Sequence, residues 1–442
     1  MEKGKIIIFG IGGLIIVIFL LMFTGILPGI KKNISTTRVV LTMWGFEDSP
    51  EIWIGISEGY NALNPNIKIE YVKKDPATFE NEIINALASG IGPDIWAFKQ
   101  SWILKHKNKI FSLPEIALQF TKSDFQRIFA DGASAFIMDK QILALPTAID
   151  TLALYYNKDI FNSENIVNPP QNWDELAEIS KKITKISSSG SIIRSGIALG
   201  TTRNIDNAVD IISALFLQNG LTILDLSKEE PKSDISSGGN NSGGVNALEF
   251  YRSFSDSVRK SYSWSDSMQN SIQAFADSKT AMIIGFSKDY ERIAGKNPRL
   301  NFGIAPLPQQ KNQPIKFNYG LVTGLTVSRN SRNPLEAWRF IIYATTDPSA
   351  VKFYLNSSNH PPTYRQYVVA DFLAPHLEVF KTQVLSARTW LQGDERAVST
   401  IFQNMVQSAR GNAQNIGQAL GVAGKQLEEL TKPYIIKPDD NK

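Results

Sequence analysis

The sequence has 442 residues, of which 43% are hydrophobic and 20% are charged. This composition is typical of a globular protein, and the length is sufficient for two domains. The net charge is +4 and the lysines and arginines are spread along the chain, so the sequence does not predict nucleic-acid binding. Cysteine is absent, which excludes disulfides, thiol catalysis, zinc–cysteine sites, iron–sulfur clusters and a lipid-modified cysteine as a membrane tether.

Residues 6–27 form an apolar run that only glycines and Thr24 interrupt. A helix of roughly 22 residues spans ~33 Å, about the thickness of a bilayer core. A cleaved signal peptide usually has a shorter apolar region of ~7–15 residues. The sequence therefore predicts that residues 1–37 are an uncleaved signal anchor, one transmembrane helix, with a short polar tether. A cleaved signal peptide is the alternative.

Strands and helices alternate in the next part of the chain. Strands are expected at 39–44, 67–71 and 95–98, and helices are expected between them, starting near Pro50 and Phe79. This alternation is typical of βαβ units and a largely parallel sheet. Later elements are predicted as helices that begin near 172 and 333, a strand at 281–286, and a helical tail at 399–430.

Residues 144–161 contain two apolar runs separated by a polar turn. The first run ends at a proline, the turn holds Asp150, and the second run contains Tyr155 and Tyr156. A carboxylate in a turn between two strands in mid-chain indicates a crossing between two lobes. Asp150 is then either a solute contact or a hinge residue that accepts hydrogen bonds.

Several further segments match one pattern in register, namely 41–44, 64–69, 89–96, 156–161, 170–176, 275–282, 302–308, 324–328 and 337–340. With the crossing segment, they resemble the family 1 extracellular solute-binding proteins, the sugar-binding receptors of ABC importers of the maltose-binding-protein type. The resemblance covers roughly residues 38–430.

The resemblance implies an α/β fold with two periplasmic-binding-protein-like lobes and a hinge. Lobe one would take residues 38–148 and 301–345, and lobe two would take 149–300 and 346–437. The implied protein binds a small solute, a sugar or oligosaccharide, and delivers it to the permease subunits of an ABC transporter. It would be a monomer at the cell membrane, with its globular part on the extracytoplasmic side, without a cofactor or catalysis.

Ligands of open α/β sheets gather beyond the carboxyl ends of strands. A sugar needs aromatic rings for its apolar faces, and carboxylates and amides for its hydroxyl groups, because each unpaired buried hydroxyl costs ~1–3 kcal/mol. The expected ligand-binding residues are Trp44, Glu47, Asp48, Trp96, Gln100, Asp150, Tyr155, Phe286, Tyr319, Tyr364 and Trp390. Trp44 and Trp96 have packing under a loop as their alternative role.

Other functions have weaker support in the sequence. A membrane-anchored receptor that presents its ligand for sensing or adhesion would share the same fold. A glycosidase could use Glu47 and Asp48 as a carboxylate pair, although adjacent residues rarely face each other across a sugar. The G-x-S-x-G pattern at 55–59 lies in a predicted helix and not at a strand-to-helix turn. Three histidines without paired spacing do not predict a metal site.

Overall fold

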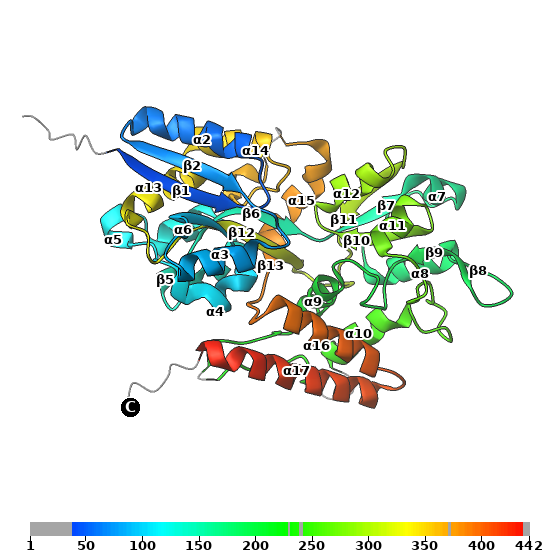
Figure 1. The fold of residues 1–442 in the computed structure, drawn as a ribbon. Helices are drawn as coiled ribbons and strands as arrows, with labels where there is room; N and C mark the ends of the chain where they lie inside the picture. Colours follow the sequence, from blue (N-terminus) through cyan, green and yellow to red (C-terminus); the bar gives the residue numbers. More distant parts are fainter. Residues whose placement is uncertain (1–37, 229, 238–241, 370–372, 436–442) are drawn as a thin grey trace, which may run out of the picture.

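The computed structural model describes residues 38–228, 230–237, 242–369 and 373–435, and Figure 1 shows their arrangement. The predicted transmembrane helix falls in residues 1–37 and lies outside the described residues. Within the described ranges, no helix combines the length and the apolar character needed to cross a bilayer.

The first lobe is built on a six-stranded sheet with the order β13-β12-β3-β1-β2, in which β6 also pairs with β12. β1 is parallel to both β2 and β3, which confirms the predicted βαβ units. β12 runs antiparallel to β3 and β6. The strands are β1 (Val39–Gly45), β2 (Ile67–Lys73), β3 (Ile95–Lys99), β6 (Leu145–Thr151), β12 (Asn318–Val327) and β13 (Ala387–Arg388).

Helices flank this sheet, and a short hairpin of β4 (Ile137–Met138) and β5 (Gln141–Ile142) adjoins it. Trp338 is fully buried. The helices are α2 (Pro50–Leu63), α3 (Phe79–Ala88), α4 (Ile103–His106), α5 (Glu115–Leu118), α6 (Lys122–Ile128), α13 (Pro334–Thr346) and α14 (Pro348–Ser357).

The second lobe contains a five-stranded sheet with the order β11-β7-β10-β9-β8. Its strands are β7 (Ala153–Asn157), β8 (Lys185–Ile186), β9 (Ile192–Ile197), β10 (Thr280–Gly285) and β11 (Phe302–Pro306). Its helices are α7 (Lys158–Ser163), α8 (Trp173–Ile183), α9 (Ala208–Gln218), α10 (Gly243–Ser253), α11 (Ser271–Ala276) and α12 (Asp289–Lys296). In Figure 1 this lobe lies to the right of the first.

The chain passes from one sheet to the other between β6 and β7, which are separated only by Leu152. It returns between β11 and β12, then continues through α15 (Glu378–Gln383) and β13 to the C-terminal helices. The helical tail predicted at 399–430 is two helices, α16 (Glu395–Ser408) and α17 (Ala413–Ile435), because Gly411 adopts a left-handed φ of 90° between them. α17 packs against α16 and α10 and also reaches α4 of the first lobe.

Two elements lie in the other lobe from the one that the sequence predicts. Residues 301–345 are predicted in lobe one, but β11 pairs with β7 in the second sheet. Residues 346–437 are predicted in lobe two, but α14 packs against α2 in the first lobe, where the rings of Trp53 and Tyr354 are 5.7 Å apart. Both differences arise because sequence order does not tell at which residue a crossing occurs.

Candidate functional site

A cavity of about 1000 Å³ lies between the two lobes. The first lobe contributes the segments that follow β1 and β3, and the second lobe contributes the start of α9 and the segment that follows β10. Strand ends and helix starts from both sheets therefore meet at one hollow, as open α/β sheets favour. The polar and charged lining residues are Glu47, Asp48, Ser49, Lys73, Lys99, Gln100, Ser101, Asp150, Asp210, Lys288, Glu291, Thr323, Ser357, Ser358, Asn359, His360, Gln392 and Glu395.

Asp48 is the centre of the contacts on the wall formed by the first lobe. Its carboxylate accepts hydrogen bonds from Trp53 Nε1 at 3.0 Å and from Tyr354 Oη at 3.3 Å. His360 Nε2 lies 3.3 Å from Asp48 Oδ1. Burial alone would lower the pKa of His360, but the hydrogen bond to Asp48 and the surrounding carboxylates raise it to about 9. At neutral pH His360 is therefore a cation paired with Asp48.

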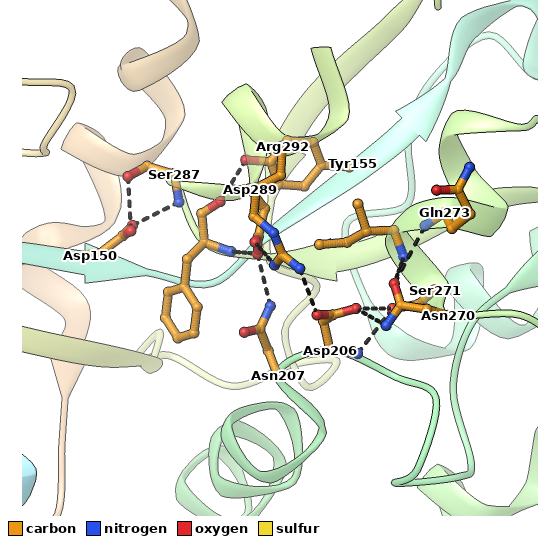
Figure 2. A network of polar contacts seen from close by, with 12 residues as sticks. Asp150, Tyr155, Asp206, Asn207, Asn270, Ser271, Gln273, Ser287, Asp289 and Arg292 are labelled. Carbon is orange, nitrogen blue, oxygen red and sulfur yellow. Dashed lines mark hydrogen bonds and ion pairs between the residues drawn. The ribbon is translucent and has the colours of Figure 1, made fainter. Parts of the chain in front are cut away.

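Asp150 connects the crossing strand to the second lobe. Its two oxygens accept hydrogen bonds from the backbone N–H of Ser287 at 2.9 Å and from the Ser287 hydroxyl at 2.8 Å, as Figure 2 shows. Burial raises the pKa of Asp150 to about 6, although the bonds from Ser287 favour the ionised form. Both interpretations of Asp150 thus have a structural basis, since it joins the lobes and also lines the cavity.

A polar network fixes the wall formed by the second lobe (Figure 2). The buried Asp289 carboxylate accepts from the Phe286 N–H at 3.0 Å and from Asn207 Nδ2 at 2.8 Å, and it pairs with Arg292 at 2.7 Å. Arg292 extends the network to Asp206 at 3.0 Å. Asn207 directly precedes α9, and Asp289 begins α12. The network therefore positions the α9 terminus that carries Asp210, and the turn that carries Lys288.

Gln100, Asp210 and Glu395 belong to three different elements and line the same cavity. The Gln100 Oε1 atom accepts from the Val322 N–H at 2.8 Å. Burial raises the pKa of Asp210 to about 7, with Lys288 opposing and Glu395 adding to the shift. The Ser101 hydroxyl donates to the Glu395 carboxylate.

Four of the eleven predicted ligand-binding residues line the cavity, namely Glu47, Asp48, Gln100 and Asp150. The other seven, all aromatic, do not. Trp44 lies on β1, where Lys74 Nζ is 4.1 Å from its ring centre. The remaining six are buried and pack in the interior, namely Trp96, Tyr155, Phe286, Tyr319, Tyr364 and Trp390.

For an aromatic residue on a strand, sequence alone does not tell which side faces the solute, because adjacent strand residues face opposite sides. Tyr155 shows this, since its hydroxyl donates to the Phe286 carbonyl at 2.6 Å inside the lobe. Trp390 donates from Nε1 to the Ser213 hydroxyl at 3.2 Å in the same way. The cavity lining is instead mostly charged and polar.

Several lining residues were missed by sequence reasoning. Lys288 lies in the turn that follows β10, so the rule of strand ends could have found it. Asp210 is in the first turn of α9, where acidic residues are favoured in any helix, so it carried no distinct signal. His360 and Glu395 belong to segments that only the tertiary fold brings to the cavity.

The G-x-S-x-G pattern at 55–59 lies within α2, as the sequence predicts. The Ser57 hydroxyl donates to the Trp53 carbonyl at 2.6 Å within α2, which is the ordinary role of a helical serine. Among the described residues, no group of three or more histidine, aspartate or glutamate side chains is placed to hold a metal ion.

The family model for bacterial extracellular solute-binding proteins matches residues 56–370. The chain belongs to this family. A binding protein of Brucella abortus (strain 2308) is 23% identical over 308 residues, which cover 69% of this chain and 71% of the relative. The maltotriose-binding protein of Pyrococcus abyssi is 24% identical over 306 residues, which cover 68% of this chain and 61% of the relative.

The fold of this solute-binding protein is also that of solved structures. The cyclic α-maltosyl-1,6-maltose binding protein from Arthrobacter globiformis superposes with a TM-score of 0.71 at 16% identity, covering 90% of this chain and all of that one. This likeness confirms the predicted two-lobed α/β architecture. The family membership confirms the resemblance seen in the sequence.

Proposed function

We propose that this solute-binding protein holds a carbohydrate between its two lobes and delivers it to the permease of an ABC transporter. The family supports solute binding, and the names of relatives and structural neighbours support a carbohydrate as the solute. A lining of carboxylates, amides, hydroxyls and amines suits a guest with many hydroxyl groups, since each of these groups can donate or accept a hydrogen bond.

The observation that carries this proposal is the placement of the cavity. Its walls come from both lobes and from the crossing strand, so a bound solute contacts both lobes at once and favours the closed form. Moving such an equilibrium from mostly open to mostly closed takes ~5.5 kcal/mol of differential binding. We also propose the lobe boundaries that the sequence predicts, with two changes: β11 belongs to lobe two and α14 belongs to lobe one.

We further propose that residues 6–27 anchor the protein in the cell membrane, with the globular part outside. The length and apolar character of this segment support an uncleaved anchor. Fractionation of expressing cells tests this point. An anchored chain stays in the membrane pellet after carbonate washing and retains its N-terminal sequence, whereas a cleaved chain is released.

The test of solute binding is a thermal-shift screen of the purified full-length chain against neutral, amino and phosphorylated carbohydrates. We expect at least one carbohydrate to raise the melting temperature and to bind with measurable heat in calorimetry. Asp150→Ala is expected to weaken this binding, because it removes a cavity carboxylate and both bonds to Ser287. Glu249→Gln, a change on α10 outside the cavity, is the control.

Failure of every carbohydrate to bind would contradict the proposal. A binding protein also leaves its ligand unchanged, so chromogenic glycosides incubated with the protein are expected to remain intact.

A further inference from the structure

Negative charge predominates in the cavity. Six carboxylates line it, against three lysines and one histidine. Of the six, only Asp48 forms an ion pair within the described part of the chain, with His360. None of the lysines forms an ion pair with these carboxylates within the described residues: Lys99 Nζ lies over the rings of Phe46 and Trp102, Lys288 Nζ lies over the ring of Phe286, and Lys73 Nζ donates to the Glu47 carbonyl. The charge of Lys288 offsets only part of the negative charge, since it lowers the pKa of Asp150 and of Asp210 against the larger effect of burial.

Two of these carboxylates, Asp210 and Glu395, line the same cavity from the starts of two helices. Asp210 lies in the first turn of α9 and Glu395 is the first residue of α16. Burial raises the pKa of Asp210 and the charge of Glu395 adds to this effect, although Lys288 opposes it. The Ser101 hydroxyl holds the Glu395 carboxylate in place. Asp210 is half-buried and Glu395 is exposed, and neither forms an ion pair within the described residues. Two such carboxylates in one cavity favour a guest that brings positive charge.

Gln100 supplies a second and independent observation at the same cavity. Its side chain is 1% exposed, and its Oε1 atom is occupied by the Val322 N–H at 2.8 Å. Its Nε2 atom has no hydrogen-bond partner among the residues that the structure describes. A buried donor without an acceptor costs about 1–3 kcal/mol, so the site favours a guest that offers a hydroxyl oxygen there.

We propose that the solute of this cavity is an amino sugar, whose ammonium group lies between Asp210 and Glu395 while a hydroxyl group accepts from Gln100 Nε2. This inference rests on the proposed carbohydrate-binding function and narrows its substrate class. A neutral hydroxyl can donate to one carboxylate, but it leaves the charge of the pair uncompensated. An ammonium group donates to both carboxylates and neutralises part of their charge.

Matched sugar pairs test the proposal. Glucosamine, galactosamine, mannosamine and the β-1,4-linked glucosamine disaccharide are compared by calorimetry with their N-acetylated forms, which keep the ring but lose the charge. At least one amine is expected to bind roughly tenfold or more tighter than its N-acetylated form, since a charged hydrogen bond contributes about 1.5–3 kcal/mol. Salt should weaken the binding of the amine more than that of a neutral sugar.

Variants identify the residues that confer the preference. Asp210→Asn and Glu395→Gln keep the shape of the side chains and are each expected to lower the preference for the amine by about tenfold. Each variant is first compared with the wild type by circular dichroism and melting temperature. Glu249→Gln is the control, because this carboxylate pairs with Arg259 on the surface.

The outcomes separate this inference from the proposed function. Binding of neutral sugars with equal or higher affinity than the amines would overturn the amino-sugar inference and leave carbohydrate binding standing. A preference for amines that survives both variants would overturn the assignment to Asp210 and Glu395. Absence of binding by every sugar tested would overturn both proposals.

Discussion

The Tyr155 hydroxyl group is enclosed in the second lobe and donates to the Phe286 carbonyl at 2.6 Å. Its ring lies 6.2 Å from that of Phe302 on β11, so the side chain belongs to the core of the lobe. We expect Tyr155→Phe to lower the free energy of unfolding by about 1 kcal/mol, as for one lost hydrogen bond. Denaturant unfolding measures this loss.

The affinity of Tyr155→Phe for the solute should remain that of the wild type, because the ring does not line the cavity. Gln100→Ala is the matched comparison and is expected to weaken binding. A large loss of affinity in Tyr155→Phe would show that Tyr155 contacts the solute after all.

The Asp210 carboxyl group predicts a pH dependence of stability. Burial raises its pKa to about 7, so its stabilising contribution is complete below the ordinary aspartate pKa of about 3.9 and is lost as the pH rises through 7. Asp210→Asn should therefore reduce the fall in stability of the solute-free protein between pH 5 and pH 8. We expect a difference of about 1 kcal/mol, because the open cavity screens part of the charge.

Denaturant unfolding of wild type and Asp210→Asn at both pH values checks this expectation. If the slope of the unfolding free energy against pH between pH 5 and pH 8 is the same in Asp210→Asn as in the wild type, Asp210 ionises as an ordinary surface carboxylate. Glu249→Gln, outside the cavity, is expected to leave the slope unaltered.

At the same scale, the polar candidates of the sequence line the cavity and the aromatic candidates do not. Glu47, Asp48 and Gln100 were predicted because they follow strands, and the end of a strand fixes where the next residues lie. Trp96 lies within β3 and packs in the core, which favours its alternative packing role over a solute contact. His360 was not predicted, because only the packing of α14 brings it to the cavity.

At the scale of elements, the local sequence signals of the first lobe were sufficient to predict its first strands and helices. Pro50 starts α2, and the structure confirms the strands β1, β2 and β3 that the apolar positions predict. Asp94 precedes β3 and accepts from the Thr42 N–H at 3.0 Å and from Ser331 Oγ at 2.6 Å. The break in the C-terminal tail was missed, because a glycine within an apolar periodic segment is also tolerated in a continuous helix.

Replacing either of two glycines of this C-terminal region by alanine is expected to change stability in opposite directions. Gly411 has a φ of 90° between α16 and α17, so Gly411→Ala is expected to destabilise the protein by about 1 kcal/mol. Gly421 lies within α17, where an added Cβ atom has nothing within 4 Å. Gly421→Ala should stabilise the protein by up to about 1 kcal/mol through helix propensity.

Thermal unfolding of the two variants measures both effects, and each serves as the control of the other. Stabilisation by Gly411→Ala would indicate that α16 and α17 form one continuous helix.

At the scale of the whole molecule, the two-lobed architecture was predictable because the motifs appear in register along the chain. The lobes to which β11 and α14 belong were not predictable from the sequence, since they depend on contacts between residues far apart in the chain. The cavity itself emerges only from the fold, because segments from residue 46 to residue 395 line it. Solute binding should draw the lobes together and lower the radius of gyration in solution scattering.

The most direct test of solute binding between the lobes is hydrogen–deuterium exchange of the full-length protein with and without a carbohydrate found in the screen. We predict protection on both walls of the cavity, at residues 46–49 and 100–101 of the first lobe and at 209–210 and 287–291 of the second. Protection confined to one lobe, or to the separate hollow of about 260 Å³ between α16 and α17, would contradict the account.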